Sequence, residues 1–245
     1  MKSAVSPYPL LALESSSAKG GAALLMEVGA PLTMDLEEGL RHGRDLLSAV
    51  SRLLEDANLP PSALKAVAVS AGPGSYTGLR VGVMAAKTLA FALRLPILAV
   101  SSLEALAETV RTAAKPEPNT TIVAVQNARR DEVYLASHRV SGEAVETVLA
   151  DRAVTPEEAA AYIRRDLDAG SPVILSGTGI AFHQDLLATL GQFSGIAHPG
   201  ASAVARIGVR HFLQEKTADP IQLQPVYLRR DPHAGWRRDS LIAGR

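Results

Sequence analysis

The stretch Ala71-Gly72-Pro73-Gly74-Ser75-Tyr76-Thr77-Gly78-Leu79-Arg80-Val81-Gly82 lies between an apolar run and a long segment rich in small residues. The apolar run, 64–71, is typical of a buried strand, and 77–94 is predicted as a helix that is apolar on nearly every side. A glycine-rich turn at such a junction gathers backbone N–H groups and the positive end of the helix dipole, which favours an anion site. The candidate phosphate or anion loop consists of Gly72, Gly74, Ser75, Thr77 and Gly78.

The same stretch has a second interpretation. Its spacing matches neither the dinucleotide-binding fingerprint nor the P-loop, in which Gly-Lys-Ser/Thr follows four intervening residues. A tight turn in which Thr77 caps a buried helix would use the same residues without any ligand. The pattern by itself leaves both interpretations open.

The segment before this stretch follows a helical period. Residues 40–57 place apolar side chains on one face and charged side chains away from it. The apolar face consists of Leu46, Leu47, Val50, Leu53, Leu54 and Ala57. Asn58 and the pair Pro60-Pro61 end the predicted helix.

The wider pattern repeats one order twice: hairpin strands, then alternating helices and strands. Strands are predicted at 10–13, 20–26, 32–36, 64–71 and 96–100, and again at 121–126, 132–138, 143–149 and 172–175, with helices at 103–113, 180–190 and 201–214. Thr155-Pro156-Glu157-Glu158 predicts a capping box at the start of one more helix. We expect a first lobe of 1–114 with 200–230, a second lobe of 115–199, and a polar tail of 231–245; the sequence itself shows no repeat.

Composition limits the classes of function that the chain is expected to have. Hydrophobic residues make up 47% of the chain but aromatic residues only 4%, so the core is expected to consist of aliphatic and small side chains. The net charge of zero argues against independent binding of nucleic acid, which usually requires a basic excess. The absence of cysteine fits a reducing cytosol, and neither a signal peptide nor an apolar run of membrane-spanning length is apparent. A soluble, cytoplasmic protein is expected.

The stretch 71–82 resembles the signature of the TsaB (YeaZ) family. Four other segments match that family in order and spacing: Leu11-Ala12-Leu13-Glu14-Ser15-Ser16, Arg41-His42 before Leu46-Leu47, Ala128-Arg129-Arg130-Asp131-Glu132-Val133-Tyr134, and Pro225-Val226-Tyr227-Leu228-Arg229. The resemblance covers about residues 10–230. It implies an α/β fold with two lobes, the actin-like ATPase (ASKHA, ribonuclease H-like) fold, with mixed sheets flanked by helices.

The resemblance also implies partners. TsaB proteins pair with TsaD, the catalytic subunit that places threonylcarbamoyl on the adenosine beside the anticodon of certain tRNAs, and a small ATPase, TsaE, joins them. This chain is therefore expected to be a non-catalytic scaffold or activator that meets tRNA through the complex. No tightly bound cofactor is expected, and ATP with Mg²⁺ would be met only within the complex.

The chain lacks some of the residues that would hold a metal or act in catalysis in this fold. Glu14 takes the place of an Asp that usually helps to hold the metal, and no two of the six histidines are four residues apart. The chain has neither a Gly-x-Ser-x-Gly elbow nor a cysteine nucleophile. We therefore expect no catalytic residue and no metal site. The alternative is a free-standing ATP-dependent phosphotransferase of the same superfamily; a metalloprotease would need a His-Glu-x-x-His motif that is missing.

The helices 40–57 and 77–94 are the predicted docking face for the TsaD-like subunit, because together they carry more apolar surface than one sheet face can cover. The predicted interface residues are His42, Leu46, Val50, Leu53, Leu54, Leu79, Val83 and Ala86. Alternatively, both helices are fully covered inside their own lobe. Without the partner, the same surface would favour a homodimer. The arginines from Arg229 onward either touch tRNA in the complex or belong to a solvated tail.

Overall fold

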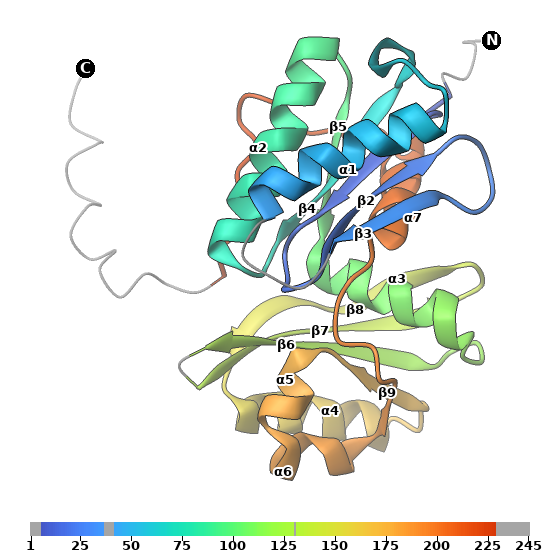
Figure 1. Cartoon of the computed structure of the whole chain (residues 1–245). Coiled ribbons are helices and arrows are strands. Elements are labelled where there is room, and N and C mark those ends of the chain that lie inside the picture. Colours follow the sequence, from blue (N-terminus) through green and yellow to red (C-terminus); the bar gives the residue numbers. More distant parts are fainter. Residues whose placement is uncertain (1–5, 37–41, 130, 229–245) are drawn as a thin grey trace, which may run out of the picture.

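Two five-stranded sheets form the framework of the chain (Figure 1). The computed structural model describes residues 6–36, 42–129 and 131–228, with backbone only for 42–44. The strand orders are β3-β2-β1-β4-β5 and β8-β7-β6-β9-β10. Counted within each lobe, both sheets run third, second, first, fourth and fifth, so the two lobes repeat one ribonuclease H-like topology. The predicted fold class, a two-lobed actin-like fold with mixed sheets flanked by helices, is confirmed.

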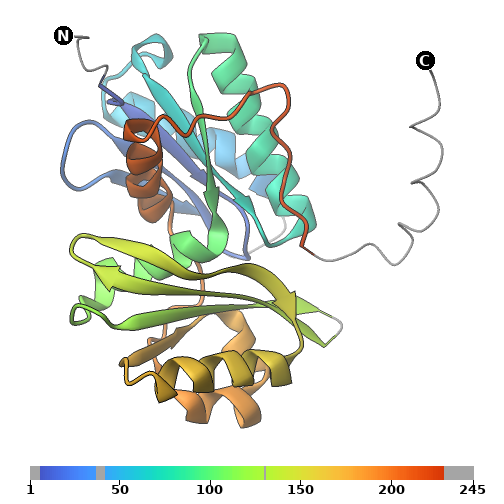
Figure 2. The same cartoon turned by 180° about the vertical axis from the view of Figure 1, so that it is seen from behind.

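The first sheet is packed between helices on both of its faces. Its strands are β1 (Leu10–Glu14), β2 (Gly20–Leu25), β3 (Leu32–Leu36), β4 (Ala66–Gly72) and β5 (Ile97–Ser101). Because side chains alternate along a strand, Leu11, Leu13 and Val67 contact α1 (His42–Asp56) and α2 (Tyr76–Leu93), while Leu10 and Ala12 contact α7 (Ala201–Leu213). Figure 2 shows α7 on the face of the sheet opposite to α1 and α2.

The second sheet is built in the same way. Its strands are β6 (Thr121–Arg129), β7 (Glu132–Ser141), β8 (Ala144–Val154), β9 (Val173–Ser176) and β10 (Gln192–Phe193). One face packs against α4 (Pro156–Asp168), α5 (Thr178–Phe182) and α6 (Gln184–Leu187) through a cluster that includes Val123, Leu135 and Ile163. The other face is covered by α3 (Ser102–Ala114), whose Leu103 and Leu106 pack on that sheet.

Helix α3 lies between the two lobes (Figure 1). Its Ala105 joins the core of the first lobe, whereas its Leu106 and Val110 join clusters of the second sheet. A boundary at residues 114 and 115 therefore does not separate the packing of the two lobes, because one helix supplies core residues to both. Ser101 adds a hydrogen bond between the lobes, because its Oγ donates to Oδ2 of Asp151 on β8 at 2.6 Å.

The segment after α7 returns along the first lobe. Ala218 pairs with Ile97 in an isolated bridge, and Nζ of Lys87 donates to the carbonyl oxygens of Ile221 and Leu223. The N–H of Val226 donates to the carbonyl of Ala71 at the end of β4, at 2.7 Å. The chain from 215 to 228 is thus fixed beside α2, and the predicted tail of 231–245 lies outside the described residues.

Most predicted elements are present with boundaries shifted by a few residues. The capping box at Thr155 is confirmed: Thr155 Oγ1 accepts from the N–H of Glu158, and the Glu158 carboxylate accepts from the N–H of Thr155. The helix predicted at 180–190 is wrong as a single element, because the chain breaks at His183 into α5, α6 and a 3₁₀ turn, η2 (Ala188–Leu190). A second 3₁₀ turn, η1 (Pro61–Ala63), precedes β4, which begins two residues later than predicted. Within the described part of the chain, no helix is both long and apolar enough to cross a membrane.

Candidate functional site: the interlobe cleft and the exposed face of α1 and α2

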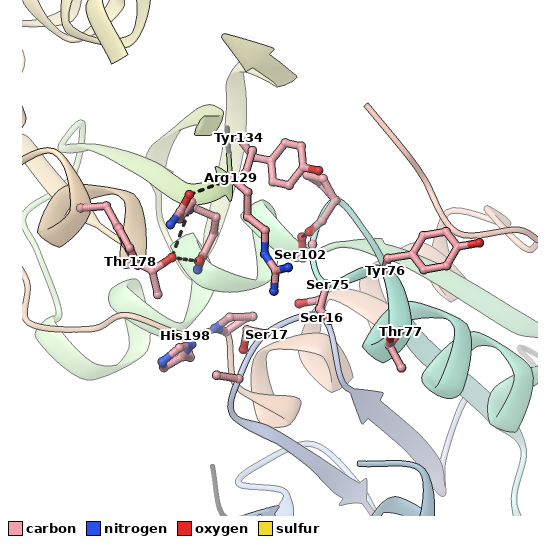
Figure 3. A pocket seen from close by; sticks show the side chains of 18 residues that line it. Ser16, Ser17, Ser75, Tyr76, Thr77, Ser102, Arg129, Tyr134, Thr178 and His198 are labelled. Atoms are coloured by element: carbon pink, nitrogen blue, oxygen red, sulfur yellow. Dashed lines mark hydrogen bonds between the residues drawn. The ribbon is translucent and has the colours of Figure 1, made fainter. Parts of the chain in front are cut away.

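A cleft of about 450 Å³ opens between the lobes (Figure 3). The first lobe contributes the β1–β2 turn at Ser16 and Ser17 and the glycine-rich stretch from Pro73 to Thr77. The second lobe contributes polar side chains near the end of β6 and the start of α5, and the loop before α7 adds His198. The predicted anion loop therefore borders a cleft that both lobes line.

The glycines of that loop make room for the β1–β2 turn. A Cβ at Gly78 would lie 2.0 Å from the carbonyl oxygen of Ser15, and one at Gly74 would lie 2.3 Å from that of Ser16. The N–H of Ser75 donates to the carbonyl of Ser16 at 2.7 Å, and the N–H of Gly78 donates to Ser75 Oγ at 3.3 Å. Two N–H groups expected to hold an anion are thus engaged within the protein.

The helix cap differs from the prediction. Helix α2 begins at Tyr76, and its N-cap is Ser75, whose side chain accepts from Gly78. Thr77, the cap in the alternative interpretation of this stretch, lies inside the first turn and is exposed, so it does not cap the helix. The reason is that the turn ends two residues earlier than the sequence pattern suggests, where Ser75 can both cap the helix and bond to the β1–β2 turn. Gly72, with φ of +120°, faces Val226 instead of the cleft.

Glu14 lies beneath the β1–β2 turn with only 1% of its surface exposed. Its Oε1 accepts from both the N–H and the hydroxyl of Ser16, at 2.5 and 2.6 Å. Burial raises the pKa of Glu14 to about 7, and the hydrogen bonds from Ser16 and a side-chain contact with Ser70 oppose only part of that rise. Glu14 does not line the cleft. Its hydrogen bonds with Ser16 hold the β1–β2 turn in place.

The wall on the second lobe is a fixed polar network. Thr178 Oγ1 donates to Gln126 Oε1 at 2.6 Å and accepts from the N–H of Asn127. Gln126 in turn donates to the carbonyl of Ala197. Arg129 follows at the end of β6, and Figure 3 shows its side chain extending into the cleft. The sequence pattern did not assign Arg129 a ligand role.

Among the described residues, no Asp or Glu lines this cleft, and no group of three or more potential metal ligands is found in that part of the chain. The lining offers one arginine, one histidine, hydroxyls and amides. Such a wall suits a neutral or negatively charged ligand better than a carboxylate-bound divalent cation, because Mg²⁺ sites in proteins are built from carboxylates and substrate phosphates.

A second hollow, of about 490 Å³, lies on the outer side of α1 and α2. Its floor is apolar and its rim carries Arg80 and Thr88. The apolar lining consists of Leu46, Leu47, Val81, Met84, Ala85 and Leu89. Leu47 is 50% exposed and Met84 62% exposed, and Phe91 on the same helix reaches 69%. Large apolar side chains that gather on an exposed face usually mark an interaction surface.

Comparison with known proteins identifies the family of this chain. Residues 39–219, most of the chain, match the family described as TsaD, tRNA N6-adenosine threonylcarbamoyltransferase. The tRNA threonylcarbamoyladenosine biosynthesis protein TsaB of Bacillus subtilis (strain 168) is 35% identical over 229 residues, which cover 90% of this chain and 93% of that protein. The chain belongs to the TsaB family.

Two further similarities of this TsaB-family chain are to a solved YeaZ structure and to a tRNA N6-adenosine threonylcarbamoyltransferase. The solved structure of YeaZ from Pseudomonas aeruginosa superposes with a TM-score of 0.80 at 27% identity, covering 90% of this chain and all of that one. A tRNA N6-adenosine threonylcarbamoyltransferase from Methanopyrus kandleri is 30% identical over 174 residues, which cover 64% of this chain and 50% of that protein. The resemblance predicted from the glycine-rich stretch is confirmed.

The interface residues predicted for this TsaB-family chain require a correction. Seven of them are buried within the lobe: Leu46, Val50, Leu53, Leu54, Leu79, Val83 and Ala86. Six of them belong to the core cluster that packs on the first sheet, and of the seven only Leu46 also lines the outer hollow, so the exposed apolar surface comes from other residues of the two helices. The physical reason is that the helical stripe with the strongest apolar period covers the protein's own sheet. His42 begins α1, and its side chain lies outside the described residues.

Proposed function

We propose that this TsaB-family chain acts in tRNA threonylcarbamoyladenosine biosynthesis as a non-catalytic subunit that docks onto a TsaD-like catalytic subunit. The docking surface is the outer face of α1 and α2, defined by Leu47, Val81, Met84, Ala85 and Phe91. The observation that carries the proposal is the exposure of the large apolar side chains of Leu47, Met84 and Phe91 on this face, beside an apolar hollow that Val81 and Ala85 help to line.

The chemistry of the docking surface suits a helical partner. Small and flexible side chains, Ala85 and Met84, lie beside Leu47 over a shallow apolar hollow. Methionine adapts to irregular surfaces, and alanine lets a helix approach closely. Arg80 stands at the rim, where its guanidinium lies 5.3 Å from the centre of the Tyr76 ring and donates to the Tyr76 hydroxyl. Protein interfaces usually have an apolar centre and a polar rim, and they are enriched in aromatic residues, Met and Arg.

Shared ancestry supports a TsaD-like partner. The family model that matches residues 39–219 spans α1, α2 and the strands β4 and β5 of the sheet beneath them. A partner built on the same model would carry an equivalent helix pair, which can meet this one about a pseudo-two-fold axis as in symmetric dimers. The same geometry allows two copies of this chain to pair through that face when the partner is missing.

The composition of the cleft supports the non-catalytic role. Its described lining supplies no carboxylate for a general base or for Mg²⁺, and Glu14 is held beneath the β1–β2 turn by Ser16. Catalysis would then reside in the TsaD-like subunit. A TsaE-like ATPase, tRNA, and any ATP with Mg²⁺ would be encountered in the assembled complex, in the cytoplasm.

The substitution Met84→Arg tests the docking surface. Co-purification with the cognate TsaD-like protein should be lost, because an arginine would be desolvated at the centre of an apolar contact. The thermal midpoint of the isolated chain should stay within about 2 °C of wild type, because an exposed side chain is changed. In gel filtration, any homodimer of the isolated chain should also dissociate.

Leu213→Arg is the matched control. Leu213 is 68% exposed and ends α7, on the opposite face of the same sheet. This variant should retain both the complex and any homodimer. If Met84→Arg binds the TsaD-like protein as wild type does, or if Leu213→Arg is the variant that loses it, the docking surface is placed wrongly.

A further inference from the structure

A hollow of about 640 Å³, the back hollow, lies at the end of α3 that is remote from the interlobe cleft. Ser102 at the start of α3 lines the cleft, whereas Glu108, Arg111 and Lys115 toward its other end line the back hollow. Helix α7 forms the facing wall, and the β2–β3 and β7–β8 turns close the sides. Figure 2 shows α7 and both turns on one side of the molecule. The 13 residues of α3 rise about 20 Å, so the back hollow is distinct from the cleft.

The floor of the back hollow is a closed group of ion pairs. Glu108 is fully buried, and Arg111 donates to both of its carboxylate oxygens, at 2.7 and 3.1 Å. Nη2 of Arg210 lies 3.5 Å from the Glu108 carboxylate and 3.7 Å from that of Glu104. Two guanidinium groups thus meet two carboxylates, and their charges compensate one another.

Two further cations line the back hollow without such compensation. Neither Lys115 nor Arg206 makes an ion pair or a side-chain hydrogen bond within the part of the chain that the structure describes. Lys115 caps the end of α3, where it complements the negative end of the helix dipole, but the half-buried Arg206 lies in the middle of α7, outside the last turn in which that dipole acts. The remaining carboxylate of the lining, Glu143, is exposed, so solvent screens its charge.

The other part of the lining is apolar. Leu25 and Val209 are buried at its base, the half-buried ring of Tyr8 stands beside them, and Val28 on the β2–β3 turn is 84% exposed. A guanidinium without a partner next to apolar side chains matches a ligand that has an anionic head and an apolar body, because each part then meets its complement.

We infer that the back hollow binds a small phosphate monoester of an apolar or aromatic alcohol. Arg206 would hold two phosphate oxygens with its planar fork, and Lys115 would reach the third from α3 as a point charge. A phosphate monoester suits this pair better than a carboxylate does, because it offers three terminal oxygens to two donors on different helices. The alcohol portion would lie against Tyr8 and Val209. The site is also remote from the docking surface, since α7 lies on the opposite face of the first sheet.

Calorimetric titration of the full chain with phenyl phosphate tests the inference, at constant ionic strength and about pH 8, where the monoester is a dianion. We expect saturable binding with Kd on the order of 1 mM or lower. Benzoate, inorganic phosphate and phenol should each bind more weakly, because each lacks either the phosphate head or the apolar body. Arg206→Ala should weaken phenyl phosphate by at least about 10-fold, the effect of losing charge-assisted hydrogen bonds. Lys115→Ala should weaken it less, because one donor is lost instead of a fork.

Arg129→Ala is the matched control, since it removes an exposed arginine that lines the interlobe cleft instead of the back hollow. It should bind phenyl phosphate as wild type does, and circular dichroism with the thermal midpoint establishes that both arginine variants are folded. Equal binding by Arg206→Ala and wild type, loss of binding in Arg129→Ala, or no saturable binding below about 10 mM would each overturn the inference. Binding of phenol, benzoate or inorganic phosphate as tight as that of phenyl phosphate would show that the assigned ligand class is wrong.

Discussion

At the scale of single residues, the glycine-rich stretch shows how one pattern can serve a different purpose from the one that it suggests. Gly74 and Gly78 resemble anion-binding glycines, but each faces a carbonyl oxygen of the β1–β2 turn at a distance that excludes a Cβ. The residues are glycines because two backbones meet there. The charged group that points into the cleft, Arg129, comes from a segment whose sequence gave no sign of a bulge or of a left-handed backbone.

Glu14→Gln tests the buried carboxyl. The folded pKa of Glu14, about 7, exceeds the ordinary value of 4.5, so the folded state holds its proton more tightly than the unfolded state. The stability that this proton contributes is complete below about pH 4.5 and is lost as the pH rises through about 7. The free energy of unfolding of Glu14→Gln should therefore gain on wild type by on the order of 3 kcal/mol between pH 5 and pH 8.

Urea unfolding at the two pH values measures this gain. Glutamine keeps an oxygen that can accept from Ser16, so the turn should survive the change. Glu146→Gln, on the exposed surface of β8, is the control and should change stability by less than about 0.5 kcal/mol at either pH. A difference between Glu14→Gln and wild type that does not vary with pH would show that the carboxyl is ionised throughout.

At the scale of elements, α1 and α2 carry two sets of apolar residues. One set packs inside the lobe, and the other is exposed to solvent. Val50 and Leu53 pack on the first sheet, while Leu47, one position after Leu46, points outward. Periodicity located the helices and their apolar face correctly. The docking prediction placed most of its interface residues on that face, which the sheet covers, as in the alternative that both helices are covered inside their own lobe; a period shows which side is apolar and not what lies against it.

Leu53→Ala and Leu47→Ala separate the two roles. Leu53 is 2% exposed, so its truncation should lower the free energy of unfolding by about 2–5 kcal/mol through the cavity that it leaves. Leu47 is half exposed, and its truncation should cost less than about 1 kcal/mol. Chemical denaturation measures both. Titration of Leu47→Ala with the TsaD-like protein should show weaker binding, and a stability loss for Leu47→Ala equal to that for Leu53→Ala would contradict the packing described.

At the scale of the whole molecule, α3 and its cap hold the lobes together. Ser101 Oγ accepts from the N–H groups of Leu103 and Glu104, which caps α3, and donates to Asp151 across the lobe boundary. Burial raises the pKa of Asp151, although the Ser101 hydrogen bond opposes that rise. One hydroxyl thus links the end of β5, the start of α3 and a strand of the second lobe.

Ser101→Ala should lower the free energy of unfolding by about 1–2 kcal/mol, because a helix cap and an interlobe hydrogen bond are lost together. For a chain of this size, each kcal/mol corresponds to about 2–4 °C in Tm. Differential scanning calorimetry measures the shift. Thr155→Ala, which removes the cap of α4 but makes no interlobe contact, is the control at about 1 kcal/mol. A smaller loss for Ser101→Ala than for Thr155→Ala would show that the link to Asp151 contributes no stability.

The sequence alone determined most of the strands and helices in their order, the two-lobed fold and the family, because these depend on local periods and on a motif whose residues are contiguous. Only the tertiary structure showed which residues pack against one another and which remain exposed. It showed that the most periodic apolar residues of α1 and α2 are internal, that Glu14 braces a turn, and that Arg129 enters a cleft without a described carboxylate. Each of these outcomes depends on contacts between segments far apart in the chain, and a local pattern carries no record of such contacts.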